Sequence, residues 1–156
     1  MNNIAILNKH AVNYLSKYNT SKKNLERILR NKIRRMKIEK KEKFFLYKSI
    51  TSIITKLEFN KFINDNSYAD SKIYFLSLQG KSKNYIKNYL MQKGIEKNII
   101  VEELNKYELN NPNWEIESAK IFIRKKKLGL KNINDLVKMA RAGFDYRISK
   151  KILEID

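Results

Sequence analysis

Two glycines that end helical stretches 49 residues apart constrain the fold of this chain more than any other feature. Gly94 and Gly143 each follow an apolar helical segment and precede a large apolar residue, Ile95 and Phe144. Glycine is favoured just past a helix end because it adopts positive φ without a side-chain clash. Such an internal repeat predicts small helical units stacked in tandem. The other apolar positions that share the offset are Leu90, Ile99 and Leu104, matched by Met139, Ile148 and Leu153.

The composition favours an all-α fold. The 156 residues contain one proline and four glycines, which argues against a turn-rich β fold, and 42% are hydrophobic, which is enough for packed cores. The clearest break is at 110–113, where the proline lies among asparagines. We therefore predict an elongated array of three tandem three-helix repeats. Their expected bounds are 1–62, which includes a long basic helix, 63–109 and 112–156.

Apolar residues at helical spacing predict the individual helices. The first is expected at 4–18, the second carries an apolar stripe from Leu25 to Met36, and the third ends near Phe62. Later helices are expected to bury Phe75, Ile133 and Val137 among other apolar side chains. The predicted N-cap residues are Ser21, Ser82 and Asp145.

The charge predicts an anionic partner. The chain has 34 Lys+Arg against 16 Asp+Glu, a formal net charge of +18, and a sequence pI of about 9.9. Nucleic acid is the first candidate partner, and an acidic membrane surface or an acidic protein is the second. The abundance of Lys, Asn and Ile also fits an A/T-biased genome, so charge clustering carries more weight than total charge.

The densest basic segment is 22–43, which has eleven Lys/Arg and three Glu. On one continuous helix, residues spaced three and four apart would form a single stripe away from the apolar face. The alternative is a solvated charged helix without a partner. The stripe comprises Arg27, Arg30, Arg34, Lys37 and Lys41, with Arg35 beside it.

Two smaller basic clusters occupy comparable places in the second and third predicted repeats, near the junction of the first and second helices. This recurrence is expected if one face of the array is basic. Together with two arginines near the last turn, they complete the candidate set for binding an anionic partner. The added residues are Lys81, Lys83, Lys87, Arg124, Lys125, Lys126, Arg141 and Arg147.

The sequence offers little for catalysis. It has no cysteine and one histidine, His10, so neither a disulfide, a thiolate nor a transition-metal site is expected. Gly-rich nucleotide-binding loops are missing, and the carboxylates are scattered among lysines. We predict no enzyme activity, no cofactor, no secretion signal and no membrane span, and expect a cytoplasmic protein. Most of the nine tyrosines are interpreted as packing residues, with base stacking as the alternative.

Four stretches follow one another in a recognisable order and cover nearly the whole chain. They are 14–25 with Leu29 and 32–35; 62–70; 79–82 with Ile86, Leu90, 92–95 and Ile99; and 140–148. In this order and spacing the chain resembles the RecX family of bacterial recombination regulators. It differs in a longer and more charged stretch at 33–54, and in Asn66-Ser67 where the family more often has an acidic pair.

The resemblance implies a curved array of three-helix repeats that acts in DNA repair, homologous recombination and the SOS response. Family members bind RecA–DNA filaments along the helical groove and limit ATP hydrolysis, strand exchange and co-protease activity. The expected protein is a monomer that binds RecA, with direct DNA phosphate contacts in support. A second hypothesis is a DNA- or RNA-binding protein of the helix-turn-helix type, with turns at Gly94 and Gly143.

Overall fold

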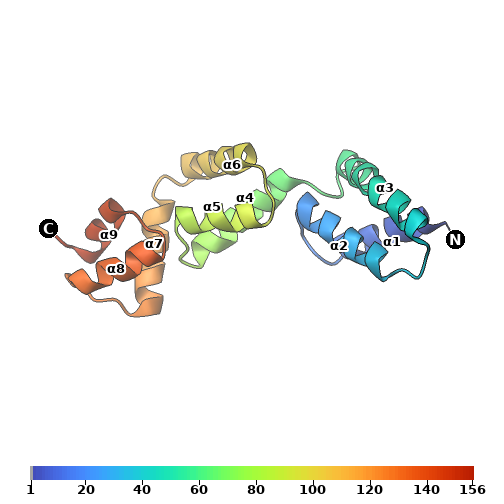
Figure 1. Cartoon of the computed structure of the whole chain (residues 1–156). Coiled ribbons are helices and arrows are strands. Elements are labelled where there is room, and N and C mark those ends of the chain that lie inside the picture. Colours follow the sequence, from blue (N-terminus) through green and yellow to red (C-terminus); the bar gives the residue numbers. More distant parts are fainter. Residues whose placement is uncertain (1) are drawn as a thin grey trace. The chain divides into compact units, whose positions relative to one another are not determined.

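Every regular element in the computed structural model is an α-helix over residues 2–156, the part of the chain that the structure describes (Figure 1). The predicted all-α class is confirmed. The helices are α1 (Asn3–Leu15), α2 (Lys22–Arg35), α3 (Lys40–Phe59), α4 (Asp65–Leu78), α5 (Lys83–Gln92), α6 (Lys97–Asn110), α7 (Trp114–Lys126), α8 (Ile133–Arg141) and α9 (Tyr146–Leu153).

The helices form two compact units. One holds the chain as far as Tyr68 together with the turn Lys93–Ile95, and the other holds Ala69–Gln92 with Glu96–Asp156. The division into three repeats stays a prediction. Among the described residues, no helix has both the length and the hydrophobicity that crossing a bilayer requires.

In the first unit, α1, α2 and α3 pack around one apolar core, with α2 and α3 in the most extensive contact. Each helix presents residues spaced three or four apart to this core, as expected of an amphipathic helix. The buried side chains are Leu7 and Ala11 of α1, Leu25, Leu29 and Ile33 of α2, Leu46, Ile50, Ile53 and Leu57 of α3, and Ile63 after it.

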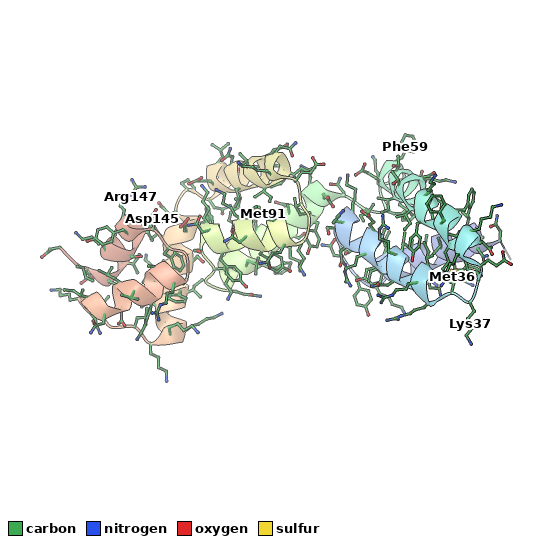
Figure 2. The ribbon with its side chains drawn as sticks, viewed as in Figure 1. Met36, Lys37, Phe59, Met91, Asp145 and Arg147 are labelled. Carbon is green, nitrogen blue, oxygen red and sulfur yellow. The ribbon has the colours of Figure 1, made fainter. Side chains whose placement is uncertain are left out.

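The predicted continuous basic helix is wrong, because α2 ends at Arg35 and α3 begins at Lys40. Met36 leaves the helix with extended backbone, at φ −71° and ψ 138°. Met36 and Ile38 then pack against the core of the first unit, and burying both favours a turn at this point. Lys37 between them points away from the ribbon (Figure 2).

The second unit has its own buried residues. Ile73, Ile86, Leu90, Ile100 and Leu104 are buried on α4–α6. A separate cluster on α7–α9 joins Ala119, Met139 and Leu153 to Phe144, whose ring centroid lies 5.5 Å from that of Phe122.

Three predicted core positions in this unit are wrong. Phe75, Ile133 and Val137 are 57%, 69% and 52% exposed. In α8 the buried face is centred on Met139 instead, with Leu136 packed beside it.

The turns α2–α3, α5–α6 and α8–α9, which the repeat prediction treats as equivalent, each have four residues: 36–39, 93–96 and 142–145. Their second residues are Lys37, Gly94 and Gly143. The two glycines have φ of 78° and 93°, which confirms their predicted role, whereas Lys37 is outside the left-handed region. A Cβ on Gly94 would collide with the side chain of Lys23, and one on Gly143 with the hydroxyl of Ser82. Glycine is therefore required for backbone conformation and for close approach.

Candidate polyanion-binding surface

The basic face of α2 lies opposite its buried stripe. Leu25, Leu29 and Ile33 are fully buried, which leaves the arginines that alternate with them on the solvent side. Arg27, Arg30, Arg34 and Arg35 are all exposed. This part of the predicted stripe is thus brought together on one helix.

Polar neighbours orient two of these arginines. Asn24 donates from Nδ2 to Thr20 Oγ1 at 2.7 Å, and its Oδ1 accepts from Arg27 Nε at 3.2 Å and Nη2 at 2.9 Å. Arg30 Nε donates to Glu26 Oε1 at 3.0 Å. A guanidinium has five N–H donors, so both side chains keep donors for a phosphate or carboxylate.

Glu26 remains a carboxylate in this setting. Burial by itself would raise the pKa of Glu26, but hydrogen bonds and charge from Arg30 and Lys23 outweigh burial and lower it. The surface is therefore basic with one fixed negative charge at its edge.

Lys37 and Lys41 do not extend this face as predicted. Lys37 lies in the turn after α2, and Lys41 lies in the first turn of α3. Both are exposed, but the helix break separates them from the α2 stripe.

In the second unit the first cluster lies at the start of α5. The ammonium of Lys81 is 4.5 Å from the ring centroid of Tyr85, a cation–π contact. Lys83 Nζ lies 3.2 Å from Glu108 Oε2, and this ion pair makes Lys83 less available to bind an anionic partner. Lys87 is half-buried.

The third cluster approaches the same loop from α7. Lys125 Nζ donates to the carbonyl of Gln79 at 3.1 Å, and Ser118 Oγ donates to the carbonyl of Lys81 at 2.6 Å. Arg124 and Lys126 are exposed beside Lys125. The structure thus brings the two clusters of this unit together at the α4–α5 loop.

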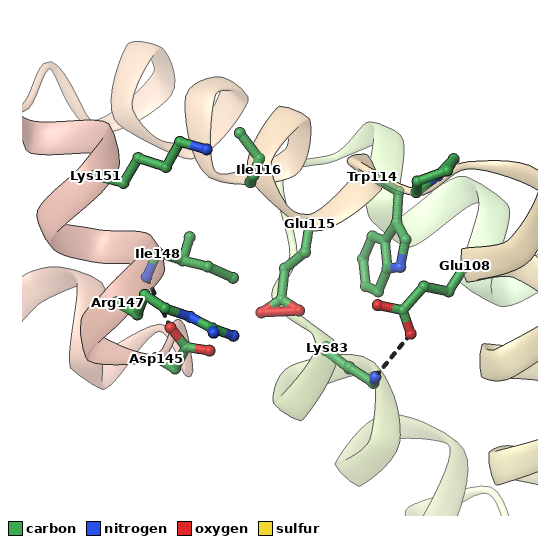
Figure 3. Close-up of a pocket in the computed structure, with 10 residues that line it drawn as sticks. Lys83, Glu108, Trp114, Glu115, Ile116, Asp145, Arg147, Ile148 and Lys151 are labelled. Atoms are coloured by element: carbon green, nitrogen blue, oxygen red, sulfur yellow. Dashed lines mark hydrogen bonds and ion pairs between the residues drawn. The ribbon is translucent and has the colours of Figure 1, made fainter.

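Arg147 occupies a different setting, a pocket of about 460 Å³ between α5, α6, α7 and α9 (Figure 3). Lys83 and Lys151 are the other basic residues of its lining, which also contains three carboxylates and therefore has balanced charge. Arg141 is exposed at the end of α8. The three carboxylates are those of Glu108, Glu115 and Asp145.

The carboxyl group of Glu115 points into this pocket (Figure 3). Burial raises the pKa of Glu115, and the nearby carboxylate of Asp145 raises it further. The ammonium and the main-chain N–H of Lys83 act in the opposite direction. Asp145 is also the N-cap of α9, because its Oδ1 accepts from the amide of Ile148 at 2.7 Å.

A set of exposed aromatic residues in the first unit was not predicted from the sequence. Phe44, Phe45 and Phe59 of α3 and Phe62 after it are 62%, 61%, 84% and 58% exposed. Helical periodicity was the available signal, since Phe45 and Phe59 lie opposite the apolar stripe of α3.

Comparisons with known proteins point to one family, although no family model matches the chain. The regulatory protein RecX of Myxococcus xanthus is 28% identical over 159 residues, covering 95% of this chain and 84% of the relative. The crystal structure of RecX from Lactobacillus salivarius has a TM-score of 0.72 and 28% identity, covering 98% of this chain and 96% of that one. This chain is similar to RecX proteins in both sequence and fold over nearly its whole length.

Several relatives named RecX are longer than this chain, which spans under half of their length. The regulatory protein RecX of Clostridium acetobutylicum is 36% identical over 104 residues, which cover 66% of this chain but 44% of the relative. A second RecX crystal structure has a TM-score of 0.69 at 19% identity, which supports the fold. The resemblance noted in the sequence is thus confirmed at the level of family and fold.

Proposed function

We propose that this chain is a cytoplasmic, monomeric, non-catalytic regulator of RecA that binds RecA–DNA filaments in their helical groove. Its main effect would be to inhibit ATP hydrolysis, strand exchange and co-protease activity. Similarity to RecX proteins over nearly the whole chain carries this proposal, and the exposed arginines of α2 give it a physical basis. Several weak basic contacts along a polyanionic filament combine through their high effective concentration.

The α2 arginines are the proposed principal contacts of the first unit. Arginine binds phosphate and carboxylate groups in bidentate geometry, which adds orientation to attraction. In the second unit, Lys81, Arg124, Lys125 and Lys126 would supply further contacts around the α4–α5 loop. Lys87, Arg141 and Arg147 stay weaker candidates.

The test measures DNA-dependent ATP hydrolysis by the cognate RecA and binding to its ATP-loaded filament. We expect the wild-type chain to suppress hydrolysis at equimolar amounts or below. Arg27→Glu/Arg30→Glu/Arg34→Glu should weaken filament binding and flatten its salt dependence, by a slope of about 0.9 for each lost duplex phosphate contact. A matched control, Lys9→Glu/Lys17→Glu/Lys97→Glu, makes the same charge change at exposed lysines outside the candidate set.

Two results would contradict the proposal. One is an unchanged hydrolysis rate when binding to the filament is saturated. The other is equal affinity for bare DNA and for the filament, which would favour the helix-turn-helix hypothesis. If the arginine variant and its control lose filament affinity equally, the loss comes from the change in net charge and not from the α2 arginines.

A further inference from the structure

The solvent face of α3 has an unusual composition for a helix in a compact unit. Lys41, Phe45, Lys48, Ser52, Thr55 and Phe59 are spaced three and four apart, so they share one face of the helix, and all six are exposed. This α3 stripe lies opposite Leu46, Ile50, Ile53 and Leu57 in the core. Phe45 and Phe59 are about 21 Å apart along the axis, at 1.5 Å per residue.

More aromatic side chains flank the α3 stripe. Phe44 is 62% exposed, and the ammonium of Lys48 lies 4.5 Å from its ring centroid. Phe59 stands out from the end of α3 (Figure 2). Phe62 follows just after the helix and is 58% exposed.

The α3 stripe is connected to the basic face of α2. The guanidinium of Arg30 lies 5.7 Å from the ring centroid of Tyr47, which is one turn away from Phe44 on α3. Lys43 also donates from Nζ to the carbonyl of Arg34 at 2.9 Å. Arginines and exposed aromatic rings therefore lie on neighbouring helices of one unit.

The chemistry of this surface selects one class of partner. A partner helix would require apolar residues at the contact positions, yet four of the six α3 stripe residues are lysine, serine or threonine. An acyl-chain surface would require a continuous apolar face, and Ser52 and Thr55 occupy its centre. Separated aromatic rings with cations and hydroxyls between them suit a strand that alternates flat bases with phosphates.

We propose that the α3 stripe with Phe44 and Phe62 is a binding site for single-stranded nucleic acid. Bases stack on the exposed phenylalanine rings, and Lys41, Lys48 and the α2 arginines neutralise phosphates. Duplex is the weaker ligand because its bases are already stacked and cannot reach the rings. This inference does not rest on regulation of RecA, and its test contains no recombinase, so the two proposals can fail independently.

The test uses the full chain and fluorescence anisotropy with a labelled 20-nucleotide oligo(dT) and a duplex of equal length. We expect the wild type to bind oligo(dT) more tightly than duplex. Phe44→Ala/Phe45→Ala/Phe59→Ala should lose about tenfold in affinity for oligo(dT) for each ring that stacks. Phe45→Tyr and Phe59→Tyr should retain binding, and Leu109→Ala, which removes an 84% exposed apolar side chain from α6, is the matched control.

Salt titration separates stacking from charge. The phenylalanine variant should lose affinity at every salt concentration with an unchanged slope, whereas Lys41→Ala/Lys48→Ala should flatten the slope. Unchanged oligo(dT) binding by the phenylalanine variant would overturn the proposal. So would equal wild-type affinity for oligo(dT) and duplex. Phenylalanine-dependent binding to phosphatidylserine vesicles, with oligo(dT) binding unaffected, would assign the surface to membranes instead.

Discussion

The hydroxyl of Ser82 donates a hydrogen bond to the main-chain oxygen of Ala142 at 2.7 Å while it accepts one from the amide of Tyr85 at 3.1 Å. Ser82 therefore caps α5 and holds the turn that contains Gly143. Ser21 does the same in the first unit, where it caps α2 through the amide of Asn24 at 3.2 Å and donates to the carbonyl of Lys93 at 2.7 Å.

A carboxylate accompanies each of these serines. Asp65 Oδ1 accepts from the amide of Lys22 at 2.9 Å, and Glu115 accepts from the main chain of Lys83 in the same way. Each negative group lies at the positive end of a helix, where it is stabilised by the helix dipole. The starts of α2 and α5 are therefore stabilised in the same way.

Replacing Ser82 should destabilise the protein more than replacing an exposed serine. Ser82→Ala removes an N-cap and a fully buried hydrogen bond, so the free energy of unfolding should fall by about 2 kcal/mol. Urea unfolding measures the change. Ser67→Ala, at an exposed position in the first turn of α4, should stay within about 0.5 kcal/mol of wild type; equal effects would mean that the Ala142 contact is not stabilising.

Gly143→Ala should destabilise the protein by more than about 1 kcal/mol. The backbone conformation is strained for alanine, and the added Cβ displaces the Ser82 hydroxyl. Gly129→Ala is the matched control, because Gly129 has no positive φ and its nearest neighbouring atom would be 3.8 Å from a new Cβ. In thermal unfolding, the Tm of the control should be close to that of the wild type. An unchanged Tm for Gly143→Ala would show that a Cβ is tolerated at this position.

Truncating Phe144 tests how far the predicted repeats depend on each other. Phe144 is 3% exposed, so Phe144→Ala should cost about 3–5 kcal/mol in its own cluster. In a tandem array the damage stays mostly local. Hydrogen exchange should show lost protection in α7–α9, while residues 2–108 keep theirs; uniform loss along the chain would instead indicate a single cooperative core.

His10 should make stability fall in mild acid. Burial lowers the pKa of His10 below its ordinary value of 6.5, and the charge of Lys32 lowers it further. The unfolded chain then binds the proton more readily, so stability is fully present above pH 6.5 and decreases as the pH falls towards the folded-state pKa. In urea unfolding between pH 7.5 and 5.5, His10→Gln should reduce the dependence of the free energy of unfolding on pH. His10 is the single histidine, so an unchanged dependence on pH would mean that the carboxylates cause it.

Most of the fold could be predicted because its signals are local. Gly94, Gly143, Ser82 and Asp145 act within a few residues of their own helix ends, and their roles were predicted from sequence. The α2–α3 break could not be predicted in this way, since it has no glycine or proline and depends on Met36 and Ile38 reaching the core. The candidate site was predicted less well, because charge clusters do not reveal which cations are already paired, as Lys83 is with Glu108.

The turn at Lys37 has a consequence for how such a chain could lengthen. Tandem duplication of a repeat needs a capping serine whose hydroxyl binds the next turn. It also needs a glycine in that turn that fits against the helix start of the preceding repeat, as Gly94 does at Lys23 and Gly143 does at Ser82. Over residues 2–156, the predicted second repeat alone carries both, in Ser82 and Gly94, while the first pairs Ser21 with Lys37 and the third pairs Asn132 with Gly143. An in-frame duplication of residues 63–109 would therefore create a new repeat junction with the same serine and glycine contacts. Duplication of the first repeat would instead place the side chain of Lys37 where only the hydrogen of a glycine fits.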